Sequence, residues 1–186
     1  RDFCLSRGLG DVYKRQSFPR STGNTPCFYN HFVTDREEPF DQPGTPEEPK
    51  GHYIFDKPEP LWNFGHGKSY TTFDYVDCAL SDTLLAASDT LKVSVMIKNT
   101  GRCDGKEVVQ LYVRDKVSTV ATPIQQLKAF QKELVPVGYT REVKLVLPIA
   151  ELALYNADME EVIEPGEFEL QIGSASDDIR IRRTII

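Results

Sequence analysis

Residues 91–113 read LKVSVMIKNTGRCDGKEVVQLYV, and this stretch decides the fold class. Apolar side chains alternate with polar ones in both halves of it: Leu91, Val93, Val95, Ile97, and then Val109, Leu111, Val113. A period of two is typical of β-strands that have one face on a core and the other in solvent. Asn99-Thr100-Gly101 is a turn signal between the halves. We therefore predict two strands that pair as a hairpin across the turn at residues 101–105.

The same alternation recurs toward the C-terminus. Further short runs lie at residues 126–131, 143–147, 168–172 and 179–181. Turn residues separate these runs, and no amphipathic helix of useful length lies among them. Six or seven short strands without helices indicate an all-β fold, a β-sandwich of immunoglobulin type.

Composition limits the function classes. The 186 residues include 22 Lys and Arg against 28 Asp and Glu, which gives a formal charge of -6. This balance and a hydrophobic share of 40% are typical of a globular protein of one domain, or of one domain and a piece. An acidic chain lacks the basic surface that nucleic acids require. Its apolar runs are also far shorter than the roughly 20 residues of a membrane span, so we expect neither partner.

Residues 35–59 differ from the rest of the chain. They hold eight acidic and three basic residues, and eight of the twelve prolines lie between Pro19 and Pro60. Closely spaced prolines interrupt both helices and central strands. We therefore predict an exposed, acidic, extended connector in this part of the chain.

Cysteine and histidine give no sign of a metal centre. The candidates are widely separated and form no C-x-x-C pair: Cys4, Cys27, Cys78, Cys103, His31, His52 and His66. We expect free thiols, solvated loop histidines, no metal and no cofactor. The chain also lacks a G-x-S-x-G nucleophile elbow and a phosphate loop. On the residues alone, it is a binding or structural sandwich with a tail.

Several motifs follow one another in a set order. Residues 60–73, PLWNFGHGKSYTTF, resemble the P-L-x-x-F-G-x-G-L-S-Y-T-x-F signature of glycoside hydrolase family 3. The family's later blocks follow at its usual spacing, as VMIKNTG (95–101), GKEVVQLYVRD (105–115), Pro123 with QLKAF (126–130), and EPGEF (164–168). Upstream, SFPRSTG (17–23) and PCFYNH (26–31) resemble the end of the family's α/β domain. Lys68, where Leu is usual, is the one clear departure.

The resemblance implies a three-domain retaining β-glycosidase, a β-glucosidase first and a β-xylosidase second. Such enzymes carry an Asp nucleophile on a barrel, an acid/base in many members on an α/β sandwich, and a fibronectin type III-like domain. Retention requires two carboxyl groups about 5–5.5 Å apart. The family's Ser-Asp-Trp type motif is absent, because Ser81-Asp82 precedes Thr83 and Ser88-Asp89 precedes Thr90. The resemblance therefore implies a segment without catalytic residues.

The resemblance also divides the chain. Residues 1–16 match nothing in the family and are predicted to be a non-native, adapter-like tail. Residues 17–34 would end the α/β domain, 35–70 would form the connector, and 71–186 would form the fibronectin type III-like domain. Implied partners are the upstream catalytic domains and a glycoside substrate. Family habit implies a periplasmic or secreted location, although the sequence shows no signal peptide.

The segment from Phe64 to Phe73 admits two interpretations. Its glycines on both sides of His66 predict an unusual backbone path, and Tyr70 and Phe73 are expected to anchor it to the sandwich. We favour a structural clasp between domains. Trp62 and His66 remain candidates for a sugar-binding rim. A different class of function, a free-standing immunoglobulin-like module that binds carbohydrate or protein, also stays open.

Overall fold

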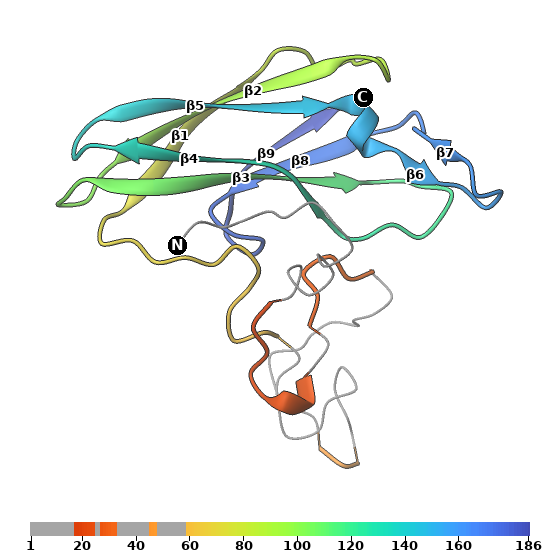
Figure 1. The fold of residues 1–186 in the computed structure, drawn as a ribbon, viewed down its shortest axis with the longest axis horizontal. Helices are drawn as coiled ribbons and strands as arrows, with labels where there is room; N and C mark the ends of the chain where they lie inside the picture. The colour runs from red at the N-terminus through yellow and green to blue at the C-terminus, as the bar shows by residue number, and fades with distance from the viewer. Residues whose placement is uncertain (1–16, 25–26, 33–44, 48–58) are drawn as a thin grey trace.

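The computed structural model describes residues 17–24, 27–32, 45–47 and 59–186. The part from residue 73 onward forms a two-layer β-sandwich, and the described segments before residue 70 lie below it in Figure 1. The long strands are β1 (Phe73–Leu80), β2 (Thr90–Asn99), β3 (Gly105–Asp115), β4 (Gln126–Val135), β5 (Thr140–Pro148), β8 (Phe168–Gly173) and β9 (Ile179–Ile185). The predicted all-β sandwich is confirmed.

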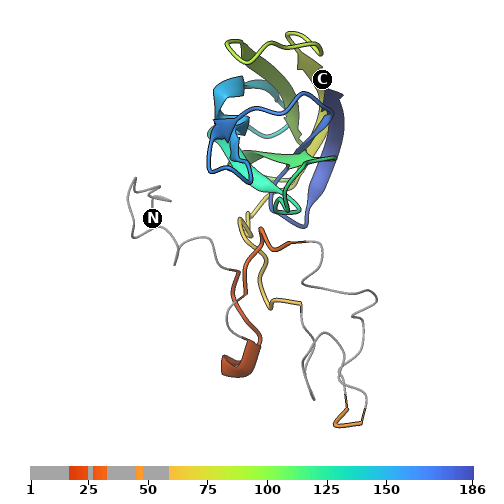
Figure 2. The same cartoon turned by 90° about the vertical axis from the view of Figure 1, so that its right-hand side faces the viewer.

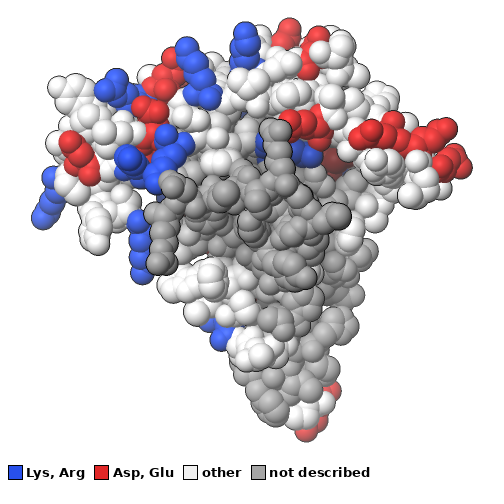
Figure 3. Space-filling model, viewed as in Figure 1, with Lys and Arg blue, Asp and Glu red and all other residues white. Residues whose placement is uncertain are grey.

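Two antiparallel sheets face each other, in the strand orders β1-β2-β5 and β4-β3-β8-β9. The short strands β6 (Leu154–Tyr155) and β7 (Glu161–Val162) pair separately, and the 3₁₀ helices are η2 (Thr22–Asn24) and η4 (Ile149–Leu152). Viewed along the strands, the sheets enclose one core (Figure 2). Asp158 and Glu160 in the β6–β7 turn and Glu161 at the start of β7 are exposed. Acidic and basic side chains are interspersed over the visible surface of the sandwich (Figure 3).

The alternation in the sequence matches the core. Alternate side chains of β2, β3, β5 and β8 point between the sheets and are fully or nearly fully buried: Leu91, Val93, Val95, Ile97, Val109, Leu111, Val113, Val143, Leu145, Leu147, Leu170 and Ile172. Burial of such side chains is the main favourable term in folding. The strand positions could thus be predicted, most clearly for β2 and β5, whose outward-facing residues are mostly polar or exposed.

The predicted hairpin of residues 91–113 is wrong. β2 pairs with β1 and β5, whereas β3 pairs with β4 and β8, so residues 100–104 cross from one sheet to the other. The Asn99 side chain holds this crossing, because its amide donates to the carbonyls of Cys103 at 2.9 Å and Val135 at 2.8 Å. Alternation cannot distinguish strands that pair edge to edge from strands that face each other across a core.

The outer face of the β4-β3-β8-β9 sheet is covered in part. Its buried polar residues on β3 and β8 are Gln110, Tyr112 and Gln171. Tyr29 and Phe64 pack over this region as a partial third layer. The predicted tail at residues 1–16, residues 25–26 and 33–34 of the predicted end of the α/β domain, and residues 35–44 and 48–58 of the predicted connector lie outside the described residues.

Candidate functional site

The clasp segment, residues 64–73, starts on the outer face of β3. The Phe64 ring stacks on Tyr29 with centroids 4.1 Å apart, and Tyr29 meets Tyr112 edge-on at 5.9 Å. The Phe64 carbonyl accepts a hydrogen bond of 2.9 Å from the Ser176 amide in the β8–β9 turn. Three parts of the chain that are far apart in sequence therefore meet at Phe64.

Gln110 connects the clasp segment to the sheet. Its side-chain amide donates to the carbonyls of Gly65, at 3.2 Å, and Ser174, while its oxygen accepts 2.6 Å from the Tyr112 hydroxyl. Gly65 has a φ of +81°, which L side chains rarely adopt. The predicted unusual backbone path is confirmed at this glycine; Gly67 has no positive φ.

The two predicted anchors behave differently. Phe73 packs against the core, as expected. Tyr70 is fully exposed at 101%, so its prediction as an anchor is wrong. The reason is local: Thr71 turns inward and donates 2.6 Å to Asn99, which leaves the neighbouring Tyr70 side chain in solvent.

The structure brings the two rim candidates together. Trp62 and His66 stack with ring centroids 4.7 Å apart, and Lys68 Nζ lies 5.3 Å from the Trp62 ring. Trp62 is 40% exposed and lies beside Phe18 and Leu61, which are also exposed. Backbone hydrogen bonds join Phe18 to Leu61 and Trp62, and we call these three exposed apolar residues the lower patch.

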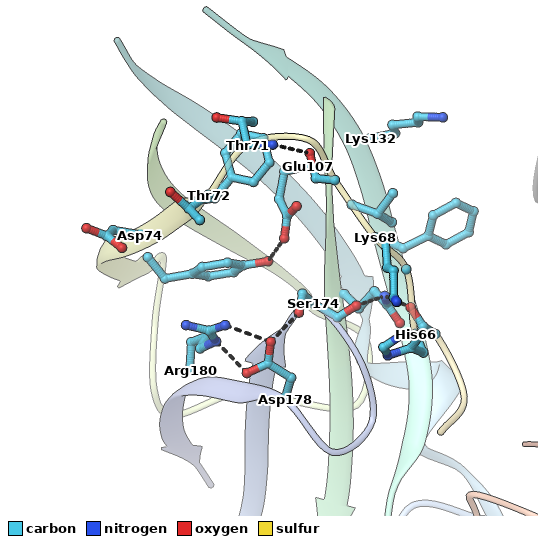
Figure 4. Close-up of a pocket in the computed structure, with 18 of the residues that line it drawn as sticks. His66, Lys68, Thr71, Thr72, Asp74, Glu107, Lys132, Ser174, Asp178 and Arg180 are labelled. Atoms are coloured by element: carbon cyan, nitrogen blue, oxygen red, sulfur yellow. Dashed lines mark hydrogen bonds and ion pairs between the residues drawn. The ribbon is translucent and has the colours of Figure 1, made fainter. Parts of the chain in front are cut away.

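A cleft of about 680 Å³ lies beside the clasp segment, which lines it together with β1, β3, β4 and the β8–β9 turn. Hydrogen bonds and an ion pair connect polar side chains of its wall (Figure 4). The Tyr75 hydroxyl donates 3.0 Å to Glu107, and Asp178 accepts from Arg180 at 2.8 Å and from Ser174 at 2.5 Å. His66 lines the cleft but Trp62 does not.

Burial and hydrogen bonds together shift the pKa values of the acidic groups in the cleft. Burial raises the pKa of Glu107, and the hydrogen bond from Tyr75 and the charge of Arg180 oppose the rise. Burial also raises the pKa of Tyr75, so this phenol keeps its proton. The hydrogen bond from Arg180 lowers the pKa of Asp178. Of these two carboxylates, Asp178 is ion-paired, whereas burial disfavours the charged form of Glu107.

Among the described residues, no three His, Cys, Asp or Glu side chains gather closely enough to hold a metal ion. Cys27, Cys78 and Cys103 are free thiols. No helix in the described part of the chain is long and apolar enough to cross a membrane.

Sequence reasoning missed the cleft and its residues Tyr75 and Glu107. One signal was present. Glu107 occupies a core-facing register position, two residues before Val109, where the alternation calls for an apolar side chain. A carboxylate at such a position is costly unless it has hydrogen-bond partners, so the break in the pattern marks Glu107 as unusual.

Comparisons with known proteins agree with the β-sandwich fold. The family model of the fibronectin type III-like domain matches residues 107–176. A β-xylosidase of Formosa agariphila is 39% identical over 166 residues, which are 88% of this chain and 22% of that protein. A periplasmic β-glucosidase of Salmonella typhimurium is 36% identical, over 84% of this chain and 20% of its own length.

Solved structures give the same result. The β-glucosidase of Listeria innocua in complex with isofagomine aligns with a TM-score of 0.78 and 34% identity. The alignment covers 91% of this chain and 23% of the Listeria chain. The chain therefore spans about a fifth of the length of the curated relatives it matches.

Proposed function

The chain belongs to glycoside hydrolase family 3, as the C-terminal region with its fibronectin type III-like domain, and from this premise we propose that it packs against the catalytic domains of a retaining β-glycosidase and holds them in place. The observation that carries the proposal is the clasp segment. Gln110 fixes Gly65 on the outer sheet face, and Phe64 fixes Tyr29, which belongs to the part that resembles the α/β domain. These contacts tie the sandwich to the chain that precedes it.

The lower patch supports the same proposal. Phe18 is 70% exposed and Leu61 48%, beside Trp62. Large apolar side chains gathered on a surface mark a contact with another domain or protein. We assign Phe18 and Leu61 of this surface to the contact with the upstream domains of the longer enzyme.

A chimera tests this role. Residues 17–186 would replace the matching C-terminal region of the Listeria innocua β-glucosidase, with and without Phe18→Ser and Leu61→Ser. We expect the chimera to be active, and the double variant to unfold at a lower temperature and to lose activity. Leu84→Ser, at a position that is 73% exposed on the sandwich, is the matched control and should change neither. Equal behaviour of both variants would contradict the role of the lower patch.

The chain is proposed to be inactive alone. Its parent enzyme would hydrolyse terminal β-linked sugars, as a β-glucosidase first, with nucleophile and acid/base supplied by the upstream domains. Incubation of the chain with aryl β-glucoside and aryl β-xyloside should give no turnover. Turnover that co-purifies with the chain would refute the proposal. A free-standing binding module has less support, because the matched relatives are much longer hydrolases.

Trp62 and His66 are proposed to reach the rim of the parent's substrate site. In the chimera, Trp62→Ala should raise KM for a disaccharide more than for an aryl glucoside, because only the longer substrate extends toward a rim. An equal effect on both substrates would remove Trp62 from the rim. By likeness to the relative named as periplasmic, we propose a periplasmic or secreted location.

A further inference from the structure

The cleft beside the clasp segment has the dimensions of a ligand site. Its volume of about 680 Å³ falls in the range of small-molecule pockets, about 300–1,000 Å³. The Trp62 ring does not line it, although His66, the other rim candidate, does. The packing role uses Phe64, Gly65 and Gln110 of the lining, but neither that role nor the rim uses Tyr75, Glu107 or Arg180.

The formal charges of the residues that line the cleft cancel. Three basic residues, Lys68, Lys132 and Arg180, face three acidic ones, Asp74, Glu107 and Asp178, so the formal sum is zero. Apolar surface from Phe73, Tyr75 and Phe130 lies among them, together with hydroxyl groups of the clasp segment. A neutral ligand with apolar faces and many hydroxyl groups fits this combination, whereas a strongly charged ligand would meet groups of its own sign.

Glu107 supplies the polar centre of the cleft. Oε1 accepts the hydrogen bond from Tyr75. Oε2 has no hydrogen bond to any described residue, and Glu107 forms no ion pair with them. A half-buried carboxylate oxygen that faces a cleft is an acceptor available to a ligand hydroxyl, and hydrogen bonds to charged groups are among the stronger ones.

We propose that this cleft is a second carbohydrate site, which binds one or two neutral pyranose units, with Glu107 as acceptor for sugar hydroxyls. Tyr75 holds the carboxylate in place and gives its ring to the apolar wall of the cleft. The choice of sugars as ligands rests on the proposed function of the parent enzyme. The site itself rests on the geometry of the described residues.

NMR titration of the 186-residue chain tests the proposal. The probes are cellobiose and xylobiose, added to about 50 mM because a small open site is expected to bind in the millimolar range. We expect saturable amide shifts that are largest at Tyr75, Glu107 and Arg180, and smaller at the Trp62 indole, which stacks on the lining residue His66. Glucuronic acid should bind more weakly, because its carboxylate would approach Glu107.

Two variants test the assigned residues. Glu107→Gln should weaken binding about tenfold, as expected for the loss of a hydrogen bond to a charged group. Tyr75→Phe should weaken it less, because the carboxylate remains but is no longer held. Glu142→Gln on β5, in the opposite sheet, and Tyr155→Phe are the matched controls and should leave the affinity unchanged. Thermal unfolding of each variant reports whether it is folded.

Three results would overturn the proposal: no saturable shifts, shifts confined to the Trp62 indole, or equal affinities of the folded Glu107→Gln variant and the wild type. The outcome is separable from the packing role. A chain that binds cellobiose but fails in the chimera would contradict the proposed function only. An active chimera whose C-terminal region binds no sugar would contradict this inference only.

Discussion

The two faces of β3 differ in how they are stabilised. Toward the core, Val109, Leu111 and Val113 pack among apolar neighbours. Toward the outside, Gln110 and Tyr112 are equally buried but make directed hydrogen bonds and ring contacts with segments that lie far away in sequence. One strand therefore builds the sandwich with its odd residues and attaches the preceding chain with its even residues.

The contrast has an energetic consequence. Apolar burial depends on area and tolerates small shifts, whereas a buried hydrogen-bond network depends on geometry and is costly when half satisfied. Substitutions in the core should thus lower the stability of the whole sandwich. Substitutions on the outer face should release the clasp segment and leave the sandwich folded.

The largest effect is expected in the core. Leu111→Ala removes a fully buried side chain and should cost about 2–5 kcal/mol of unfolding free energy, because transfer and cavity terms add. Urea unfolding followed by far-UV circular dichroism measures it. Leu84→Ala, at a 73% exposed position, is the control and should stay within about 0.5 kcal/mol of wild type. A small loss at Leu111 would mean that the core collapses around the deletion.

Two glycines of the clasp segment, Gly65 and Gly67, allow the same substitution to be compared at a strained and at an unstrained position. An alanine at position 65 would have to keep the φ of +81°, which L side chains rarely adopt. Its Cβ would lie 2.9 Å from Gln110 Nε2 and closer still to Gln110 Oε1. We expect Gly65→Ala to cost about 1–3 kcal/mol. Gly67→Ala meets no atom within 4 Å and should be nearly neutral.

Trp62 fluorescence and far-UV circular dichroism separate the two parts of the structure, because Trp62 is the single tryptophan. In Gly65→Ala, the fluorescence transition should come at lower urea than the dichroism transition. If both transitions shift together, the clasp segment and the sandwich unfold as one unit, and the contrast between the two faces of β3 is wrong.

The next effect depends on pH. Because burial raises the pKa of Glu107 in the folded state, its ionisation costs stability above its unfolded pKa of about 4.3, and this cost disappears below that value. Glu107→Gln should therefore raise Tm at pH 7, and the gain should shrink toward zero near pH 4. Thermal unfolding at the two pH values measures it. A gain that grows at low pH would show that the carboxylate is stabilised when charged.

The sequence predicted some parts of this picture and not others, for physical reasons. Strand positions followed from alternation, and the unusual backbone path at Gly65 followed from the glycines on both sides of His66. The hairpin failed because facing and neighbouring strands share one pattern. The cleft could not be predicted, since Tyr75, Glu107 and Arg180 come from β1, β3 and β9 and meet only in the folded sandwich.

The smallest effect concerns Lys68, the departure from the family motif. Its ammonium group lies 5.3 Å from the Trp62 ring at the surface, where a cation–π contact contributes about 0.5–1 kcal/mol. A double-mutant cycle of Lys68→Leu and Trp62→Phe should give a coupling energy in that range, measured by urea unfolding, with Lys144→Leu as an exposed control. Because Gln110 and Phe64 hold the clasp segment by buried contacts, neither single variant should release it. A coupling well above about 1 kcal/mol would instead mean that the exposed rim, and not the buried outer face of β3, fixes the clasp segment.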